Sequence, residues 1–247
     1  MFGWYKGLHR AKPTATPAAY KMATTIDASS ILNPNDTDFA KRVVVHDIDL
    51  RTILPDRERK PYVMVLENVC TLEECRKLIE LSEQGQYTTA LLNEIVRTDV
   101  RNSDRYMRDD PEIAELLWKR LKPYVPVNIG SMPVEVVGLN ERLRFLRYDP
   151  GMKFEGHMDG TYIRPGGREL SRVTVQLYLN EGFEGGETTF LGTYEDYPVV
   201  PKTGLVLIFE HALLHEGSAV RAGRKYAIRT DVMYRRRNNG SRLAIFD

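Results

Sequence analysis

The carboxy-terminal half of the chain consists of short stretches in which apolar and polar residues alternate with a period of two. Alternation of this kind places successive side chains on opposite faces of a β-strand. Many short strands interrupted by tight turns indicate an antiparallel sandwich or jelly roll. The strand-like stretches are residues 141–148, 170–179, 188–190, 204–209 and 226–234. The Pro- and Gly-rich turn sequences between them are residues 149–151, 164–167, 184–186 and 221–223.

The residues before this half predict one strand, at 62–69, and two helices. The first helix should span residues 72–84, because Thr71 and Glu74 form a capping-box sequence. The second should span residues 111–124, with Asp109 or Asp110 as its cap. We therefore expect a mostly β fold with buttressing helices (α+β), built on a double-stranded β-helix, or cupin-like jelly roll. The apolar helix faces would be formed by Leu72, Cys75, Leu78 and Ile79, and by Ile113, Leu116, Leu117 and Leu121.

The chain divides into four parts by composition. Residues 1–60 indicate a partly ordered amino-terminal arm, in which residues 42–46 have the pattern of a strand. Residues 61–132 are expected to form the helical and strand buttress, and residues 133–237 the double-stranded β-helix core. Residues 238–247 would be a carboxy-terminal tail.

The charge balance argues against two kinds of partner. With 35 basic and 34 acidic residues, the chain has no excess charge that would attract a nucleic acid or a membrane surface. We expect a small-molecule or peptide substrate instead; the sequence leaves the oligomeric state open. The first acid is Asp27, so the amino terminus weakly resembles a transit segment, but the prediction is a cytoplasmic protein. Cys70 and Cys75 are expected to be reduced and structural.

His157-Met158-Asp159 and the distant His215 are the candidate metal ligands. Alternate residues of a strand point the same way, so His157 and Asp159 can reach one metal, and a third ligand must come from another strand. Two imidazoles and a carboxylate form the facial triad that holds Fe(II) with coordination positions left open. His211 and His215 also have the i, i+4 spacing of zinc hydrolases, although the general base of that motif is replaced by Ala212.

Cationic residues follow His215. On a strand beginning near Lys225, the side chains of Lys225, Ala227, Arg229 and Asp231 share one face. Inward-facing cations need an anionic partner, because an unpaired buried charge is costly. A dicarboxylate would supply that partner.

The carboxy-terminal half resembles the iron(II)/2-oxoglutarate-dependent dioxygenases, and among them the prolyl 4-hydroxylase-like branch. The resemblance spans residues 62–237 loosely and residues 143–234 well. It is carried by Arg147-Tyr148-Asp-Pro-Gly, His157-x-Asp159, Tyr178-Leu-Asn180, residues 184–190, Pro201-x-x-Gly204, and His215 with the later Gly-x-Lys225-Tyr226.

The resemblance implies a role for each matching residue. His157, Asp159 and His215 would bind Fe(II), and Lys225 would pair with the distal carboxylate of 2-oxoglutarate, with the adjacent Arg224 held in reserve. Arg229 would approach the keto-acid end or the substrate. The remaining pocket residues would be Tyr148, Tyr178, Thr174 and Gln176, the last two because they share the face of Tyr178. Candidate substrate-binding residues are Arg101, Asn102 and Arg105 in a polar loop at residues 100–108, and Tyr162 and Arg164 after the metal-binding Asp159.

The resemblance also implies the reaction. We expect a dioxygenase that hydroxylates an unactivated C–H bond and couples this to decarboxylation of 2-oxoglutarate to succinate, with O₂ as oxidant and ascorbate as reductant. The substrate would be a prolyl residue, a free amino acid or a small metabolite. Two alternatives stay open at this point: a non-catalytic jelly-roll binding module and a zinc hydrolase using His211 and His215.

Overall fold

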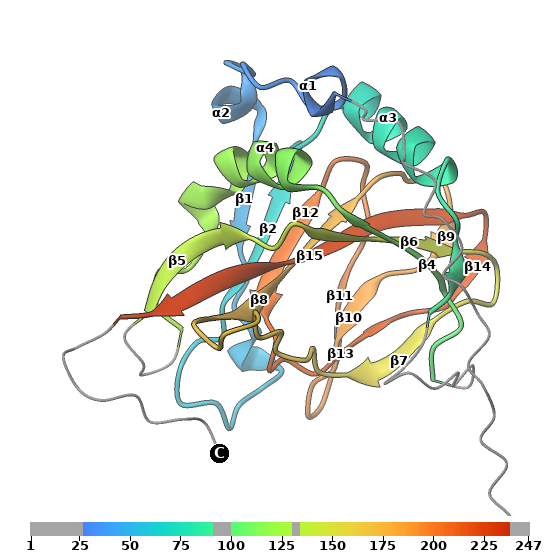
Figure 1. Cartoon of the computed structure of the whole chain (residues 1–247). Helices are drawn as coiled ribbons and strands as arrows, with labels where there is room; N and C mark the ends of the chain where they lie inside the picture. The colour runs from blue at the N-terminus through green and yellow to red at the C-terminus, as the bar shows by residue number, and fades with distance from the viewer. Residues whose placement is uncertain (1–26, 91–99, 130–133, 238–247) are drawn as a thin grey trace, which may run out of the picture.

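A large antiparallel sheet is the framework of the protein. The computed structural model describes residues 27–90, 100–129 and 134–237, and within these ranges the sheet has nine strands. Its order is β1-β2-β12-β8-β15-β6-β4-β3, and β5 also pairs with β15 (Figure 1). The strands are β1 (Val44–Asp47), β2 (Val63–Glu67), β3 (Thr88–Thr89), β4 (Asp104–Asp109), β5 (Val134–Leu139), β6 (Arg142–Tyr148), β8 (Glu169–Tyr178), β12 (Val206–Glu210) and β15 (Lys225–Arg236).

A smaller sheet faces the large one and completes the jelly roll. In the described part of the chain it contains four antiparallel strands in the order β11-β10-β13-β7, and a two-stranded ribbon, β14-β9, lies beside it. These strands are β7 (Phe154–His157), β9 (Glu184–Gly185), β10 (Thr188–Phe190), β11 (Tyr197–Val199), β13 (His215–Gly217) and β14 (Val220–Ala222).

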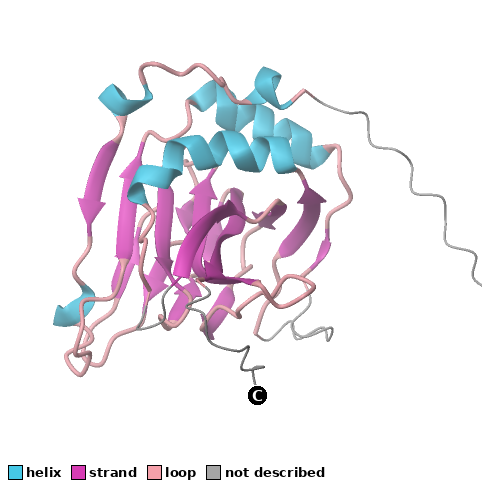
Figure 2. Ribbon diagram, turned by 60° about the vertical axis from the view of Figure 1, so that its left-hand side comes forward, coloured by secondary structure: helices cyan, strands magenta, loops and turns pink. Residues whose placement is uncertain are grey.

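Helices cover the other face of the large sheet (Figure 2). Asp110 is the N-cap of α4, and its side chain accepts a hydrogen bond from the Ile113 backbone amide. None of the helices in the described ranges has the length and apolar character needed to cross a membrane. These helices are α1 (Ala28–Ile31), α2 (Phe39–Arg42), α3 (Leu72–Glu83), α4 (Pro111–Leu121) and the 3₁₀ turn η2 (Lys122–Tyr124). A second 3₁₀ turn, η1 (Leu50–Thr52), lies apart from them, and its Leu50 packs into the core between the two sheets.

Strand alternation divides the interior into two layers. On β8, Val173, Val175 and Leu177 point into the apolar core that the helices close. The alternate residue Tyr178 belongs to a second core between the two sheets, together with Phe190 and Phe209. The large sheet therefore presents an apolar face to the helices and a mixed polar face to the inside of the jelly roll.

The mostly β fold with buttressing helices is confirmed, and three local predictions were wrong. Leu72 is 73% exposed and lies outside the buried face of α3, because it stands at the first position of the helix. Arg42 ends helix α2, and the strand begins only at Val44. The expected loop at residues 100–108 is largely strand β4, which pairs with β6 along its whole length. Cross-strand pairing, which the polar local sequence does not reveal, decides this last case.

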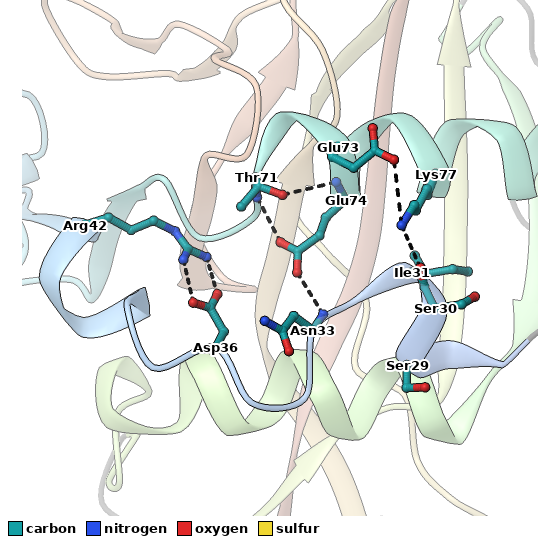
Figure 3. A pocket seen from close by; sticks show the side chains of 10 residues that line it. All are labelled: Ser29, Ser30, Ile31, Asn33, Asp36, Arg42, Thr71, Glu73, Glu74 and Lys77. Carbon is teal, nitrogen blue, oxygen red and sulfur yellow. Dashed lines mark hydrogen bonds and ion pairs between the residues drawn. The ribbon is translucent and has the colours of Figure 1, made fainter.

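A buried ion pair joins the helices to the sheet. Arg120 of α4 donates from Nη2 to Glu74 Oε1 at 2.6 Å and from Nη1 to Glu74 Oε2 at 2.9 Å. Glu74 also accepts from the backbone amides of Thr71 and Asn33, which ties the start of α3 to the segment after α1. Figure 3 shows the contacts of Glu74 with Thr71 and Asn33 at the wall of a hollow of about 300 Å³. Both ionic side chains are almost fully buried, so each depends on the other.

Replacing Glu74 with Gln should lower the free energy of unfolding by about 3 kcal/mol, because Arg120 keeps its buried charge, loses its bidentate counter-ion and retains only the more distant Asp36, at 3.4 Å. Urea denaturation followed by circular dichroism measures the change. The control is Glu73→Gln on the same helix, whose carboxylate pairs with the exposed Arg76 and should leave the unfolding midpoint nearly unchanged. Equal effects of the two substitutions would contradict the structural role of the Glu74–Arg120 pair.

Candidate metal centre

The pairing of β7 with β13 brings two distant histidines together. His157, the last residue of β7, lies directly opposite His215, the first residue of β13. Their ring centroids are 4.4 Å apart. The Nε2 atom of His157 is 3.7 Å from Asp159 Oδ1, and that of His215 is 3.9 Å from Asp159 Oδ2. One ligand atom from each of the three residues therefore lies within 4.8 Å of the other two.

Asp159 reaches this position from beyond the strand. β7 ends at His157, so strand alternation does not orient the carboxylate as the sequence predicted. Instead, the Asp159 backbone amide donates to the His211 carbonyl at 3.0 Å. The carboxylate accepts a hydrogen bond from Thr174 Oγ1 and forms an ion pair with Arg229 Nη2 at 2.8 Å. A backbone contact, a hydroxyl donor and an ion pair thus hold the carboxylate toward the histidines.

Both imidazoles are held with Nε2 directed at the centre. His157 Nδ1 donates to the Glu155 carbonyl at 2.7 Å, and His215 Nδ1 donates to the Leu213 carbonyl at 2.8 Å. A carbonyl can only accept, so these bonds assign the ring proton to Nδ1 and leave the Nε2 lone pair free. The Phe154 ring stacks on His157 with a centroid distance of 3.5 Å, which fixes the plane of that imidazole. Such outer contacts are what orient the ligands of a metal ion.

The electrostatics keep the three groups in the forms that bind a cation. Burial and the neighbouring His215 lower the pKa of His157 to about 4, and burial also lowers the pKa of His215. Burial opposes ionisation of Asp159, but the charge of Arg229 and the hydrogen bond from Thr174 favour it, and the pKa of Asp159 lies below its usual value. At neutral pH the centre therefore holds two neutral imidazoles and one carboxylate, which is the protonation state that metal binding requires.

Lys225 lies at another wall of the same cavity and is 2% exposed. Its Nζ donates to the Gly186 carbonyl at 2.6 Å and stands 4.9 Å from the centre of the Tyr148 ring. Burial lowers the pKa of Lys225 to about 8, against a weaker opposing effect of Glu187. No carboxylate within the described ranges lies at ion-pair distance from this ammonium, so the site offers a buried cation to an anionic ligand.

The cavity that joins these groups is small, at about 30 Å³. Roomier hollows, of about 300 and 350 Å³, lie on the helical side and carry none of the candidate ligands. The small cavity is the candidate active site, because the two neutral imidazoles, the Asp159 carboxylate and the buried Lys225 ammonium all line it. Its lining residues are Arg101, Leu146, Tyr148, Phe154, His157, Asp159, Gln176, Thr188, His215, Glu216, Gly217, Lys225 and Arg229.

Not all of the predicted pocket residues line this cavity. Tyr148, Gln176 and Arg229 do, whereas Tyr178 and Thr174 lie behind its wall. The Tyr178 hydroxyl donates to Thr188 Oγ1 at 2.7 Å, so it supports a lining residue. Arg224 is on the outer side, where its Nη2 donates to Asp149 Oδ2 at 3.1 Å.

The five candidate substrate-binding residues are scattered. Arg101 lines the cavity and is 7% exposed. Asn102 is used structurally: its Nδ2 donates to the Gly151 carbonyl at 3.2 Å, and its Oδ1 accepts from the Lys153 amide at 2.7 Å. Arg105 lies on β4, opposite Leu146 of the lining.

The other two candidates lie between β7 and β8, away from the lining residues. The Tyr162 backbone donates to Ser171 Oγ at 2.8 Å. Arg164 pairs with Glu141 and with Glu169, the latter at 3.0 Å. The side chain of Arg164 is thus already engaged by two carboxylates.

The zinc-hydrolase alternative is wrong in its geometry. Residues 211–213 form a turn, so His211 and His215 do not lie on one helical face. His211 stands apart from the three clustered ligands, with Nε2 3.5 Å from Asp231 Oδ1.

Two residues that shape the centre, Asp231 and Phe154, were assigned no role from the sequence. Asp231 accepts from Arg144 Nη1 at 2.9 Å and lies 3.4 Å from Arg229 Nη2, so it holds Arg229 beside Asp159. Its place on the same strand face as Arg229 was a usable signal. The stacking of Phe154 on His157 had no such signal, because it depends on an irregular register between β7 and β13.

The donor set fits a metal ion with open coordination positions. Two imidazole nitrogens and one carboxylate are the ligands of non-haem Fe(II), and the adjacent buried cation offers an anion site. The residues present therefore fit iron together with a carboxylate-bearing co-substrate.

Comparison with known proteins agrees with this chemistry. The model of the 2OG-Fe(II) oxygenase superfamily matches residues 143–230, which include the three clustered ligands and Lys225. A probable prolyl 4-hydroxylase 10 of Arabidopsis thaliana is 29% identical over 213 residues, covering 68% of this chain and 67% of that protein. A PKHD-type hydroxylase of Crocosphaera subtropica is 23% identical, covering 75% of this chain and 84% of that protein.

The fold has solved counterparts as well. The crystal structure of a prolyl-4-hydroxylase from Pseudomonas putida superposes with a TM-score of 0.51 at 19% identity, covering 76% of this chain and all of that one. At this identity the likeness concerns the fold alone, and it identifies the two facing sheets as the jelly roll of these oxygenases. Residues 143–230 thus match the 2OG-Fe(II) oxygenase superfamily, and the chain is similar to prolyl 4-hydroxylases and PKHD-type hydroxylases.

Proposed function

We propose that the chain is an Fe(II)- and 2-oxoglutarate-dependent hydroxylase in which His157, Asp159 and His215 hold the iron. One observation carries the proposal: a two-His, one-carboxylate cluster lines the same small cavity as a buried lysine that has no carboxylate partner among the described residues. An iron ligand set alone would suit several chemistries. The added cation suits a co-substrate with a carboxylate at each end, because one end can reach the metal while the other pairs with Lys225.

The overall reaction would convert the substrate, O₂ and 2-oxoglutarate into hydroxylated substrate, succinate and carbon dioxide. One oxygen atom enters the substrate and the other enters succinate. When bound, the iron supplies the activation of O₂ that side chains cannot provide. Ascorbate would serve as a reductant that keeps the iron in its Fe(II) state.

The protein's own residues would bind and orient. Lys225 would pair with the distal carboxylate of 2-oxoglutarate, and the ring of Tyr148 packs beside the Lys225 ammonium. Gln176 donates from Nε2 to Thr188 Oγ1 at 3.1 Å, and this bond ties β8 to β10 across the cavity. Phe154 and Leu146 supply apolar wall that excludes water from the reacting centre.

The substrate is proposed from the relatives as well as from the site. Prolyl 4-hydroxylases and PKHD-type hydroxylases are among the proteins that this chain resembles. A prolyl residue in a peptide, a free amino acid or a small metabolite would all present a C–H bond to such a centre.

The three clustered ligands, His157, Asp159 and His215, should be indispensable for the reaction. His157→Ala and Asp159→Ala should each lower succinate release by at least about 100-fold, because loss of a ligand weakens iron binding. Succinate is measured with Fe(II), 2-oxoglutarate and ascorbate, with and without candidate substrates. The control is His46→Ala, since His46 is a half-exposed histidine on β1 that pairs with Glu67. Succinate release by both ligand variants at the parent rate would refute the proposed function.

Lys225→Met should weaken 2-oxoglutarate binding by roughly 10–150-fold, because one charge-assisted bond is lost while the side-chain volume is kept. Iron binding should be retained. The visible charge-transfer band in an anaerobic titration of the Fe(II) protein reports both. Arg224→Ala is the matched control, because Arg224 is adjacent but pairs with Asp149 on the outer side. A stronger effect of Arg224→Ala would transfer the role to that residue.

The same titration should depend on pH in the parent protein. The pKa of Lys225 is about 8 without co-substrate, and a carboxylate binds its ammonium form. The dissociation constant should therefore be flat below pH 8 and rise by about tenfold per pH unit above it. Lys225→Met should bind weakly at every pH without this rise. The same rise in the variant would assign the pH dependence to another group.

A further inference from the structure

The inner face of the large sheet gathers arginines around the cavity. Arg144 of β6 and Arg229 of β15 are direct cross-strand partners. Arg105 of β4 lies opposite Leu146, one step along the same face, and Arg101 enters from the residues before β4. Arg101 and Arg229 line the cavity itself.

Carboxylates do not balance these arginines. Asp231 accepts hydrogen bonds from Arg144 and Arg229, and Asp159 forms an ion pair with Arg229. For Arg101 and Arg105, the described ranges provide no carboxylate within ion-pair distance. Arg229 also keeps a buried Nε without an acceptor. Once Asp159 binds a metal cation, its charge is no longer available to Arg229, and the excess of positive charge increases.

Arg101 is the most deeply buried of these uncompensated cations. Its Cζ lies 4.5 Å from the centre of the Phe154 ring, which in turn stacks on His157. The one side-chain hydrogen bond of Arg101 to a described residue runs from Nε to Ser103 Oγ at 3.2 Å. Burial lowers the pKa of Arg101, and the nearby Arg105 and Arg229 lower it further. A guanidinium held one aromatic ring away from a metal ligand, with no carboxylate partner among the described residues, needs an anion to offset its desolvation.

The co-substrate does not fill this role. Its distal carboxylate is assigned to Lys225, four residues from Arg229 along β15, which is about 13 Å of extended strand. Arg229 and Lys225 therefore offer two separate cationic positions in the cavity. An anion at the arginines would belong to the second substrate.

We propose that the molecule hydroxylated at this centre carries an oxyanion, a carboxylate or a phosphate, which binds to Arg101 with the support of Arg105 and Arg229. The inference rests on the proposed function and narrows its substrate class. Guanidinium forks bind both kinds of oxyanion through paired hydrogen bonds, so the geometry names their shared chemistry. Fixing the anion at Arg101 sets the distance between the anchored end of the substrate and the metal.

The test uses the anaerobic protein saturated with Fe(II) and 2-oxoglutarate, which cannot turn over without O₂. Calorimetry measures binding of acetyl-L-proline against its uncharged amide, and of methyl phosphate as a separate arm. At least one anionic probe should bind at concentrations up to about 10 mM, and the amide should bind at least about tenfold more weakly than acetyl-L-proline if the anion is a carboxylate. Binding of methyl phosphate alone would identify a phosphate.

Variants locate the anion. Arg101→Ala should weaken binding of the successful probe by at least about tenfold, and Arg101→Lys should restore part of it, because the charge is kept and the fork is lost. Arg105→Ala should have a smaller effect. The control is Arg142→Ala on β6, because Arg142 is already neutralised by Asp109. The 2-oxoglutarate affinity, read from the visible band, should stay within about threefold of the parent in all four variants.

Two results would overturn the inference while leaving the proposed function intact. The first is normal 2-oxoglutarate binding with no anionic probe bound, or with the amide bound as well as the acid. The second is an Arg101→Ala variant that loses 2-oxoglutarate affinity and keeps probe binding, which would assign Arg101 to the co-substrate. Failure of the parent protein to bind 2-oxoglutarate would overturn both proposals.

Discussion

Burial of charge on the inner face of the large sheet is the constraint on which the rest of the structure depends. A jelly roll built only for stability would fill the space between its sheets with apolar side chains, as Phe190 and Phe209 do at one end. At the other end, Lys225, Arg229, Asp231 and Asp159 occupy that space. Buried charges persist only with partners, and part of the partnership here is left for ligands. The open positions of the site follow from this incomplete compensation.

Each of the two sheets supplies a different part of the site. The small sheet supplies the histidines, through the β7–β13 pairing, and orients them with backbone carbonyls. The large sheet supplies the cations, through the register of β15 with β6 and β8. Asp159 belongs to neither sheet, yet Arg229 and Thr174 of the large sheet hold it toward the histidines. The helices and the Glu74–Arg120 pair stay on the opposite face, where they stabilise the sheet without entering the site.

The sequence predicted the parts of this arrangement that depend on local periodicity. Alternation gave the strands of the jelly roll and put Lys225 and Arg229 on one face, and both line the cavity. Capping signals gave α3 and α4 because a cap is a local interaction. What the sequence could not give depends on pairing between distant segments: β4 as a strand, Asp159 outside a strand, and Phe154 stacked on His157. Tyr162 and Arg164 follow Asp159 closely in sequence, which is why they are candidates for substrate binding. In the structure they lie outside the cavity lining, where Tyr162 bonds to Ser171 of β8 and Arg164 pairs with Glu141.

The central claim is that His157, Asp159 and His215 bind one metal ion and leave room beside it for a co-substrate. Anomalous X-ray diffraction from crystals grown anaerobically with Fe(II) and 2-oxoglutarate tests it most directly. The account predicts one iron peak about 2.0–2.2 Å from both Nε2 atoms and from a carboxylate oxygen of Asp159. Density for the co-substrate should extend from that peak to Lys225 Nζ. An iron peak elsewhere, or none at these three residues, would contradict the account.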